Sequence, residues 1–156
     1  MQNLYFLFLA ASLAPLCLAQ SGGPSVPQSS NSGFTALVND AKTRIKEMNV
    51  DQLKALQASG EKFTLIDVRE DNEWEAGHAA EAVHLSKGVI EREIEKAAPA
   101  KNTRLVLYCG GGSRSALATD SLLKMGYTNA FSLAGGLGAY TKAGLPTEKP
   151  AEPSKK

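Results

Sequence analysis

The chain reads Leu105-Val106-Leu107-Tyr108-Cys109-Gly110-Gly111-Gly112-Ser113-Arg114-Ser115-Ala116-Leu117-Ala118 at the point that decides its fold. Four apolar residues typical of a buried strand lead to a cysteine, and three glycines and a serine follow it. Arg114 then opens an expected helix. This order predicts a thiol inside a short loop of free backbone N–H groups at a helix N-terminus. Such a loop stabilises a thiolate and binds an anion beside it.

Helical and extended patterns alternate on both sides of this stretch. Short apolar runs predict strands over residues 63–68, 82–85, 105–108 and 129–133. Patterned segments predict helices between Asp51 and Gly60 and over residues 70–76, 89–98, 114–125 and 137–143. Strands that alternate with helices of this length predict an α/β fold whose parallel sheet is covered on both faces. Ligands of such sheets bind beyond the carboxyl ends of the strands, which is where Cys109 is expected.

The length of 156 residues leaves room for one domain with a core and for tails. We place the domain at residues 34–148, and apolar residues at helical spacing predict an amphipathic helix over 34–48 at its start. Residues 20–33, rich in Ser, Gly and Pro, are expected to be a flexible linker, and residues 149–156 a disordered tail. A net charge of +1 gives no reason to expect nucleic acid or an anionic membrane as partner.

The first 19 residues have the pattern of a secretory signal peptide. Residues 4–18 are uncharged and mostly apolar, and Cys17-Leu18-Ala19 before Gln20 resembles a small-residue cleavage site, although Lys and Arg are missing at the start. The apolar run is shorter than the roughly 20 residues of a membrane span. Leu16 is too large for a lipoprotein site at Cys17. We therefore expect an exported protein, periplasmic or secreted, with membrane contact only if the segment stays uncleaved or is lipidated.

Removal of that segment leaves Cys109 as the only cysteine, so the mature chain cannot form an internal disulfide. A lone cysteine is often a small buried hydrophobe. Three adjacent glycines argue against that reading, because ordering them costs backbone entropy that a core strand does not need to lose. Two histidines, one remaining cysteine and no clustered ligand spacing predict neither a metal site nor a cofactor.

The loop can activate a thiol without a neighbouring base. A helix N-terminus and the Arg114 guanidinium both lower the pKa of a nearby cysteine. The amides of Gly110, Gly111 and Gly112 can turn inward because no Cβ is in the way, and Ser113 is a candidate contact to a bound anion. Arginine-loop cysteine phosphatases have the spacing Cys-x5-Arg, whereas this chain has Cys-x4-Arg. The smaller ring favours a sulfur atom carried on the cysteine over a phosphate.

Four ordered segments make the chain resemble a single-domain rhodanese, a member of the rhodanese-like sulfurtransferase family. They are Leu65–Glu70 with Glu73-Trp74 and Gly77-His78, Tyr108-Cys109 through Arg114-Ser115, Gly126–Asn129, and Leu133–Gly136. The resemblance covers residues 49–148. It implies the rhodanese fold, a five-stranded parallel sheet flanked by helices on both faces, and a catalytic persulfide on Cys109.

The chain departs from the family pattern at two places. Tyr140 stands where the family usually has Trp. Residues 110–113 carry no side-chain charge, whereas rhodaneses that favour thiosulfate often have additional cations around this loop. Thiosulfate is therefore expected to bind weakly, and a persulfide, a polysulfide or a protein partner would also fit as donor.

Other residues of the motifs have simpler expected roles. Asp67 and Arg69 end a predicted strand on the ligand side, where they could join the hydrogen bonds of the site or form an ion pair that holds the following loop. Ser115 is expected to cap the helix start. Trp74 is expected to be a core aromatic, and the two histidines, His78 and His84, to be satisfied structural residues.

The expected function is transfer of sulfane sulfur. Cys109 would take the outer sulfur of thiosulfate or another donor and pass it, as a persulfide, to cyanide or a thiol. The partners would be a small sulfur-containing anion or thiol, or a thiol-bearing protein. Two alternatives stay open, namely a non-catalytic sulfur carrier or partner-binding module of the same fold, and a cysteine phosphatase or arsenate reductase.

Overall fold

The structure is a computed structural model that describes residues 33–150. The predicted signal peptide (residues 1–19), the linker up to residue 32 and the tail from residue 151 lie outside the described residues. The helices are α1 (Gly33–Lys42), α2 (Val50–Ala58), α3 (Asp71–Ala76), α4 (Ile90–Ala97), α5 (Ser113–Lys124) and α6 (Gly136–Lys142). The strands are β1 (Lys46–Met48), β2 (Thr64–Asp67), β3 (His78–Ala79), β4 (Val83–His84), β5 (Leu105–Tyr108), β6 (Ala130–Leu133) and β7 (Thr147–Glu148).

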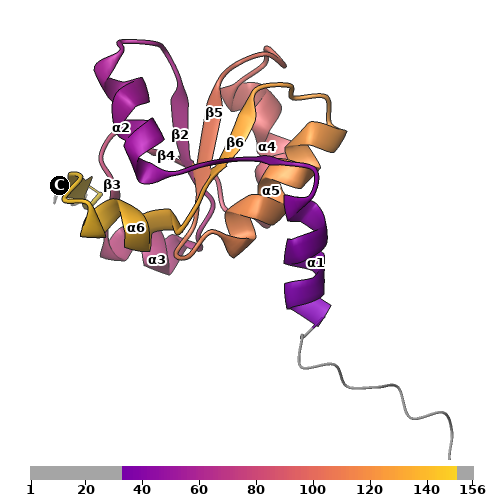
Figure 1. The fold of residues 1–156 in the computed structure, drawn as a ribbon, viewed down its shortest axis with the longest axis horizontal. Coiled ribbons are helices and arrows are strands. Elements are labelled where there is room, and N and C mark those ends of the chain that lie inside the picture. Colours follow the sequence, from indigo (N-terminus) through magenta and orange to yellow (C-terminus); the bar gives the residue numbers. More distant parts are fainter. Residues whose placement is uncertain (1–32, 151–156) are drawn as a thin grey trace, which may run out of the picture.

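Within residues 33–150, five strands form one parallel sheet in the order β1-β6-β5-β2-β4. β5 lies at its centre, between β2 and β6 (Figure 1). β3 and β7 form a separate antiparallel pair. The predicted α/β fold with a five-stranded parallel sheet is confirmed. No helix in this part of the chain is long and apolar enough to cross a membrane.

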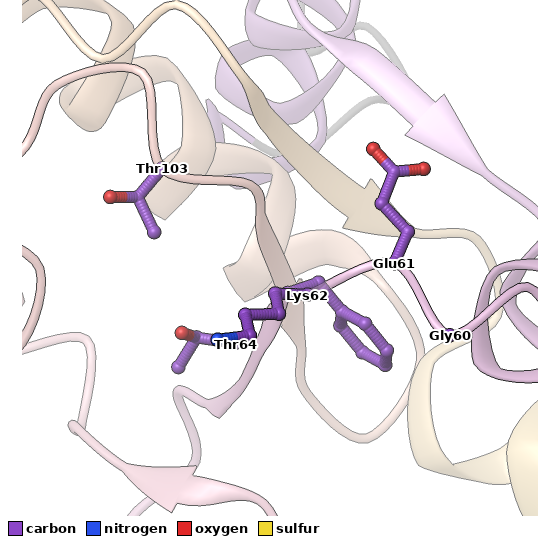
Figure 2. A pocket seen from close by; sticks show the side chains of 6 residues that line it. Gly60, Glu61, Lys62, Thr64 and Thr103 are labelled. Atoms are coloured by element: carbon purple, nitrogen blue, oxygen red, sulfur yellow. The ribbon is translucent and has the colours of Figure 1, made fainter.

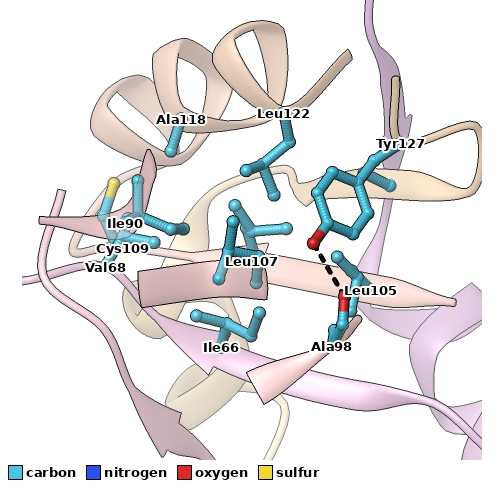
Figure 3. Close-up of a cluster of buried hydrophobic side chains, with 12 residues drawn as sticks. Ile66, Val68, Ile90, Ala98, Leu105, Leu107, Cys109, Ala118, Leu122 and Tyr127 are labelled. Atoms are coloured by element: carbon cyan, nitrogen blue, oxygen red, sulfur yellow. Dashed lines mark hydrogen bonds between the residues drawn. The ribbon is translucent and has the colours of Figure 1, made fainter. Parts of the chain in front are cut away.

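Both faces of the sheet are covered because successive strand residues point to opposite sides. Leu105 and Leu107 of β5 belong to the core formed with α4 and α5 (Figure 3). Val106 and Tyr108, the alternate residues, belong to the core formed with α2 and α6. All four are fully buried, as expected for a central parallel strand.

The predicted helix over residues 34–48 is wrong in its second half. α1 ends at Lys42, and Lys46–Met48 pair with Phe131–Leu133 of β6 as an edge strand. The helical spacing holds as far as Ala41, which is buried where α1 packs against α5. Met48 is instead buried against the sheet, and its carbonyl accepts the N–H of Ala134 at 2.8 Å. Pairing with the sheet overrides the local helical pattern.

Candidate active site

Cys109 lies where β5 ends and the chain turns into α5. Its side chain is 2% exposed, and its sulfur accepts the N–H of Gly112 at 3.1 Å. Gly112 is the cap of α5, with a φ of 99° that favours glycine. A Cβ at this position would lie 3.2 Å from the nitrogen of Gly135. Gly112 is thus required by the turn and by the segment packed against it.

Two opposing effects act on the Cys109 thiol. Burial raises its pKa, but the N–H groups of Ser115 and Gly112 and the Ser115 hydroxyl together hold the pKa below the ordinary cysteine value. Hydrogen bonds to the charged form of a group favour that form, and those of a helix N-terminus are well placed to do so. The loop therefore favours a thiolate without a basic side chain.

Ser115 does not cap α5, contrary to the prediction. Gly112 occupies the cap position, and Ser115 lies fully buried in the first turn. The Ser115 hydroxyl lies 3.8 Å from the Cys109 sulfur and 3.1 Å from the Gly112 carbonyl, to both of which it can donate. It also lies 2.9 Å from the hydroxyl of Ser132. A buried thiolate requires hydrogen-bond donors, and the Ser115 hydroxyl supplies one from within the helix.

Ser132 was not predicted as a site residue. It lies on β6, next to β5, and is fully buried. It shares a face of the sheet with Ala130, a member of the core on the α5 side. Strand alternation, combined with the order of the strands, is the signal that would have placed its hydroxyl against α5.

Arg114 is bound by a carboxylate from α3. Its Nη1 and Nη2 donate to the two oxygens of Glu73 at 2.5 and 2.8 Å, and Nη1 lies 3.9 Å from Glu70. Hydrogen bonding to Arg114 lowers the pKa of Glu73 to about 2. Glu73 is part of a motif named in the sequence analysis, but no role was predicted for it. Because β2 and β5 are neighbours, the residues that follow them meet at one edge of the sheet.

The first turn of α6 holds the loop from the other side. The Leu137 N–H donates to the Cys109 carbonyl at 2.7 Å, and the Gly138 N–H donates to the Gly110 carbonyl at 3.1 Å. Gly136 has a φ of 53°, and a Cβ there would lie 2.2 Å from the Cys109 carbonyl oxygen. These contacts fix the carbonyl groups of the loop on α6 and leave N–H groups for the sulfur.

Asp67 and Arg69 form a buried ion pair with each other. Nε and Nη2 of Arg69 donate to the Asp67 carboxylate at distances of 2.6 to 3.0 Å. Nη2 of Arg69 also donates to the carbonyl of Gly77 at 2.8 Å. The pair thus connects the end of β2 to the start of β3, which is the geometry of an ion pair that holds the intervening loop.

The histidines stack on Trp74. The ring centroids of His78 and His84 lie 3.3 and 4.9 Å from that of Trp74, with nearly parallel planes. A ring nitrogen of His78 lies 3.1 Å from the Trp74 carbonyl, and one of His84 lies 2.9 Å from the Arg69 carbonyl. Both histidines therefore have structural partners, and Trp74 is half-buried instead of enclosed in the core.

A separate open pocket lies at the other end of the sheet. Figure 2 shows its lining, which is Gly60, Glu61, Lys62, Phe63, Thr64 and Thr103. These residues precede or begin β2 and β5, whereas Cys109 follows β5. The pocket is thus distinct from the cysteine loop. In residues 33–150, no group of three His, Cys, Asp or Glu side chains is placed to hold a metal ion.

Comparison with known proteins gives consistent matches. Residues 49–143 match the family described as Rhodanese-like domain. A sulfurtransferase from Allochromatium vinosum is 30% identical over 106 residues, which are 68% of this chain and 97% of that protein. The probable adenylyltransferase/sulfurtransferase MoeZ of Mycobacterium tuberculosis is 38% identical over 84 residues, 54% of this chain. The chain spans only 21% of that relative's length.

A solved structure from Rhodopseudomonas palustris has the same fold. It is a protein of unknown function, described as a possible tyrosine phosphatase, with a TM-score of 0.66 and 28% identity. The match covers 79% of this chain and 99% of that chain.

Proposed function

We propose that this chain, which belongs to the rhodanese-like family, transfers sulfane sulfur through a persulfide on Cys109. The observation that carries the proposal is the buried Cys109 sulfur, which accepts N–H groups at the start of α5. A thiolate held in this way is a nucleophile at neutral pH. The sulfurtransferase relative, which the chain covers almost completely, supports the same chemistry.

The proposed reaction has two displacement steps. The Cys109 thiolate attacks the outer sulfur of thiosulfate, a bond forms between the two sulfur atoms, and sulfite leaves with the electron pair of the broken S–S bond. Cyanide or a thiolate then attacks the outer sulfur of the persulfide, and the Cys109 thiolate leaves. The N–H groups of Gly111, Gly112 and Ser115 stabilise the negative charge on the sulfur.

Steady-state kinetics test this proposal. With thiosulfate and cyanide both varied, a covalent sulfur intermediate predicts ping-pong kinetics. Cys109→Ser is expected to abolish turnover while leaving the thermal unfolding transition close to that of the wild type. Turnover in Cys109→Ser at the wild-type rate would exclude the proposal.

Phosphate-ester hydrolysis is the second candidate, because the Rhodopseudomonas palustris protein is described as a possible tyrosine phosphatase. Two features of this chain weigh against it. The loop has the spacing Cys-x4-Arg, and both terminal nitrogens of Arg114 are bound to Glu73. Hydrolysis of p-nitrophenyl phosphate that depends on Cys109 would favour the phosphatase.

Export is a further part of the proposal. It is supported by the apolar residues 4–18 and the small-residue pattern that ends at Ala19. Expression of the full chain in a bacterium, followed by fractionation and intact mass, tests it. A mature protein that begins at Gln20 in the periplasm or medium is expected, and an unprocessed cytoplasmic chain would contradict export.

A further inference from the structure

Arg114 is the cation that the cysteine loop contributes, yet its charge is compensated within the structure. Glu73 binds both terminal nitrogens of the guanidinium, and Glu70 lies 3.9 Å from Nη1. The side chains of Arg114 and Glu73 are 30% and 32% exposed, so the pair is only partly screened by solvent. One positive and two negative groups therefore lie together beside the loop.

The other charged groups at this edge of the sheet do not restore a positive field. Asp67 and Arg69 are paired with each other and buried. Lys87 lies on the loop after β4, where its backbone N–H donates to the Val68 carbonyl at 3.0 Å. The segments at this edge carry Lys87 and Arg114 as well as Glu70, Asp71 and Glu73, so their side chains add no net positive charge.

What remains to attract an anion is the set of backbone N–H groups. A helix N-terminus is equivalent to about half a positive charge. These N–H groups favour the negative charge of a thiolate or a persulfide on Cys109. The site already holds the Cys109 thiolate when a donor arrives. A donor with two negative charges is therefore repelled more strongly than a donor with one.

We propose that Glu73 is a specificity-determining residue that makes the loop select singly charged sulfane-sulfur donors, such as organic thiosulfonates and persulfides, over dianionic thiosulfate. The inference rests on the proposed sulfur transfer at Cys109. In the loading step the thiolate attacks the outer sulfur of a thiosulfonate, a new S–S bond forms, and the sulfinate leaves with the electron pair of the old bond. Charge balances, since two monoanions give two monoanions.

The test compares two donors that differ by one charge. Methanethiosulfonate and thiosulfate both present an outer sulfur bound to a sulfonyl group, and a methyl group replaces one charged oxygen. Loading of Cys109 is followed by intact mass spectrometry after rapid quenching. In Glu73→Gln, loading by thiosulfate is expected to rise about tenfold, the effect of one charge a few ångströms away. Loading by methanethiosulfonate is expected to rise by only about threefold, because a donor with one negative charge gains half the electrostatic energy of a donor with two.

Glu75→Gln is the matched control. It removes the same charge from the same helix, but Glu75 is exposed and outside the pair with Arg114. Both donors are expected to load this variant at rates close to those of the wild type. Glu70→Gln keeps the Arg114–Glu73 pair and is expected to raise thiosulfate loading by about twofold. If Glu73→Gln does not fold, Glu70→Gln tests whether carboxylate charge beside Arg114 governs donor choice, and unchanged thiosulfate loading in this variant would contradict the inference.

The outcomes separate the inference from the function on which it rests. If the wild type is loaded by neither donor, the sulfur-transfer function fails. If the wild type is loaded but Glu73→Gln changes the loading rates of both donors by the same factor, the role of Glu73 in specificity is excluded. It is also excluded if the loading rate with thiosulfate does not change. The same conclusion follows if Glu75→Gln reproduces the effect.

Discussion

The Cys109 sulfur has apolar neighbours on one side and hydrogen-bond donors on the other. It belongs to the core cluster that contains Val68 and Ile90, as Figure 3 shows, and it also accepts the N–H of Gly112. The first environment disfavours a charge and the second favours it. Because the donors outweigh burial, the pKa of the thiol is lowered. The two buried serines beneath the sulfur are part of that balance.

Ser132→Ala is predicted to raise the pKa of Cys109. Ser132 lies 2.9 Å from the Ser115 hydroxyl, and its loss removes a partner that positions this hydroxyl near the sulfur. The rate of alkylation by iodoacetamide, measured against pH, should therefore rise at a higher pH than in the wild type. At high pH the two rates should converge, because both thiols are then ionised.

Ser121→Ala on α5 is the control for this change and should keep the wild-type profile. A midpoint for Ser132→Ala that is equal to or lower than that of the wild type would contradict the role of the serine pair. Loss of the Ser132 hydroxyl is also expected to cost about 1 kcal/mol of stability.

The local sequence predicted the thiol and the glycines but not all of their partners. Cys109 and Gly112 are close in the chain, so strand, loop and helix signals place them together. Ser132 and Glu73 reach the site from other elements, which only the order of strands in the sheet brings together. Their roles could not be predicted without that order.

At the scale of elements, the cysteine loop is held between α3 and α6. α3 contributes the carboxylate that binds Arg114, and α6 contributes two N–H groups to the carbonyls of Cys109 and Gly110. The close approach of α6 depends on a glycine, because a side chain at position 136 would meet the backbone of the loop.

Gly136→Ala is predicted to destabilise the fold and to impair the loop. A Cβ would lie 2.2 Å from the Cys109 carbonyl oxygen, and the positive φ adds backbone strain. Urea unfolding should show a loss of about 3 kcal/mol, from overpacking and strain together.

Gly88→Ala provides the comparison, since nothing lies within 4 Å of a Cβ at that position. It should change stability by less than about 1 kcal/mol. Equal stability of the two variants would contradict a close contact between α6 and the cysteine loop at position 136.

Element boundaries were predicted best where local and tertiary preferences agree. β5 was predicted with its observed bounds, because four apolar residues before a glycine loop suit only a buried strand. The helix predicted beyond Lys42 was wrong, because the edge strand found there forms only by pairing with β6, which is distant in sequence. β3 and β7 were missed for the same reason, since each has two residues and pairs only with the other.

At the scale of the whole molecule, two carboxylates connect α5 to the rest of the fold. Glu73 binds Arg114 at the start of α5, and Asp120 binds Arg44 and Lys124 further along it. Hydrogen bonds from these arginines lower the pKa of each carboxyl to about 2. A carboxyl with a lowered pKa stabilises the fold above its unfolded pKa of about 4. That contribution is lost as the pH falls through the folded value.

The double variant Glu73→Gln, Asp120→Asn is therefore predicted to be less stable than the wild type at pH 7. The difference in unfolding free energy should shrink as the pH falls below about 4, and it should vanish near pH 2. Urea unfolding monitored by circular dichroism between pH 2 and 7 measures this. A difference that is the same at both ends of the range would mean that the two ion pairs do not account for it.

The arrangement of the whole molecule follows from the alternation of strands and helices, which predicted a parallel sheet with Cys109 at the carboxyl end of β5. Donor preference is a different matter. The uncharged residues 110–113 led to the prediction that thiosulfate binds weakly, but the carboxylates at the start of α3 that lie beside Arg114 could not be placed there from the sequence.

The central claim is that Cys109 carries sulfur, and intact mass spectrometry of the purified protein tests it most directly. After incubation with a sulfane-sulfur donor, the wild type should gain the mass of one sulfur atom on the peptide that contains Cys109. It should lose that mass when cyanide is added, and Cys109→Ser should gain nothing. A wild-type chain that gains no sulfur, or a Cys109→Ser chain that gains it equally, would contradict the account.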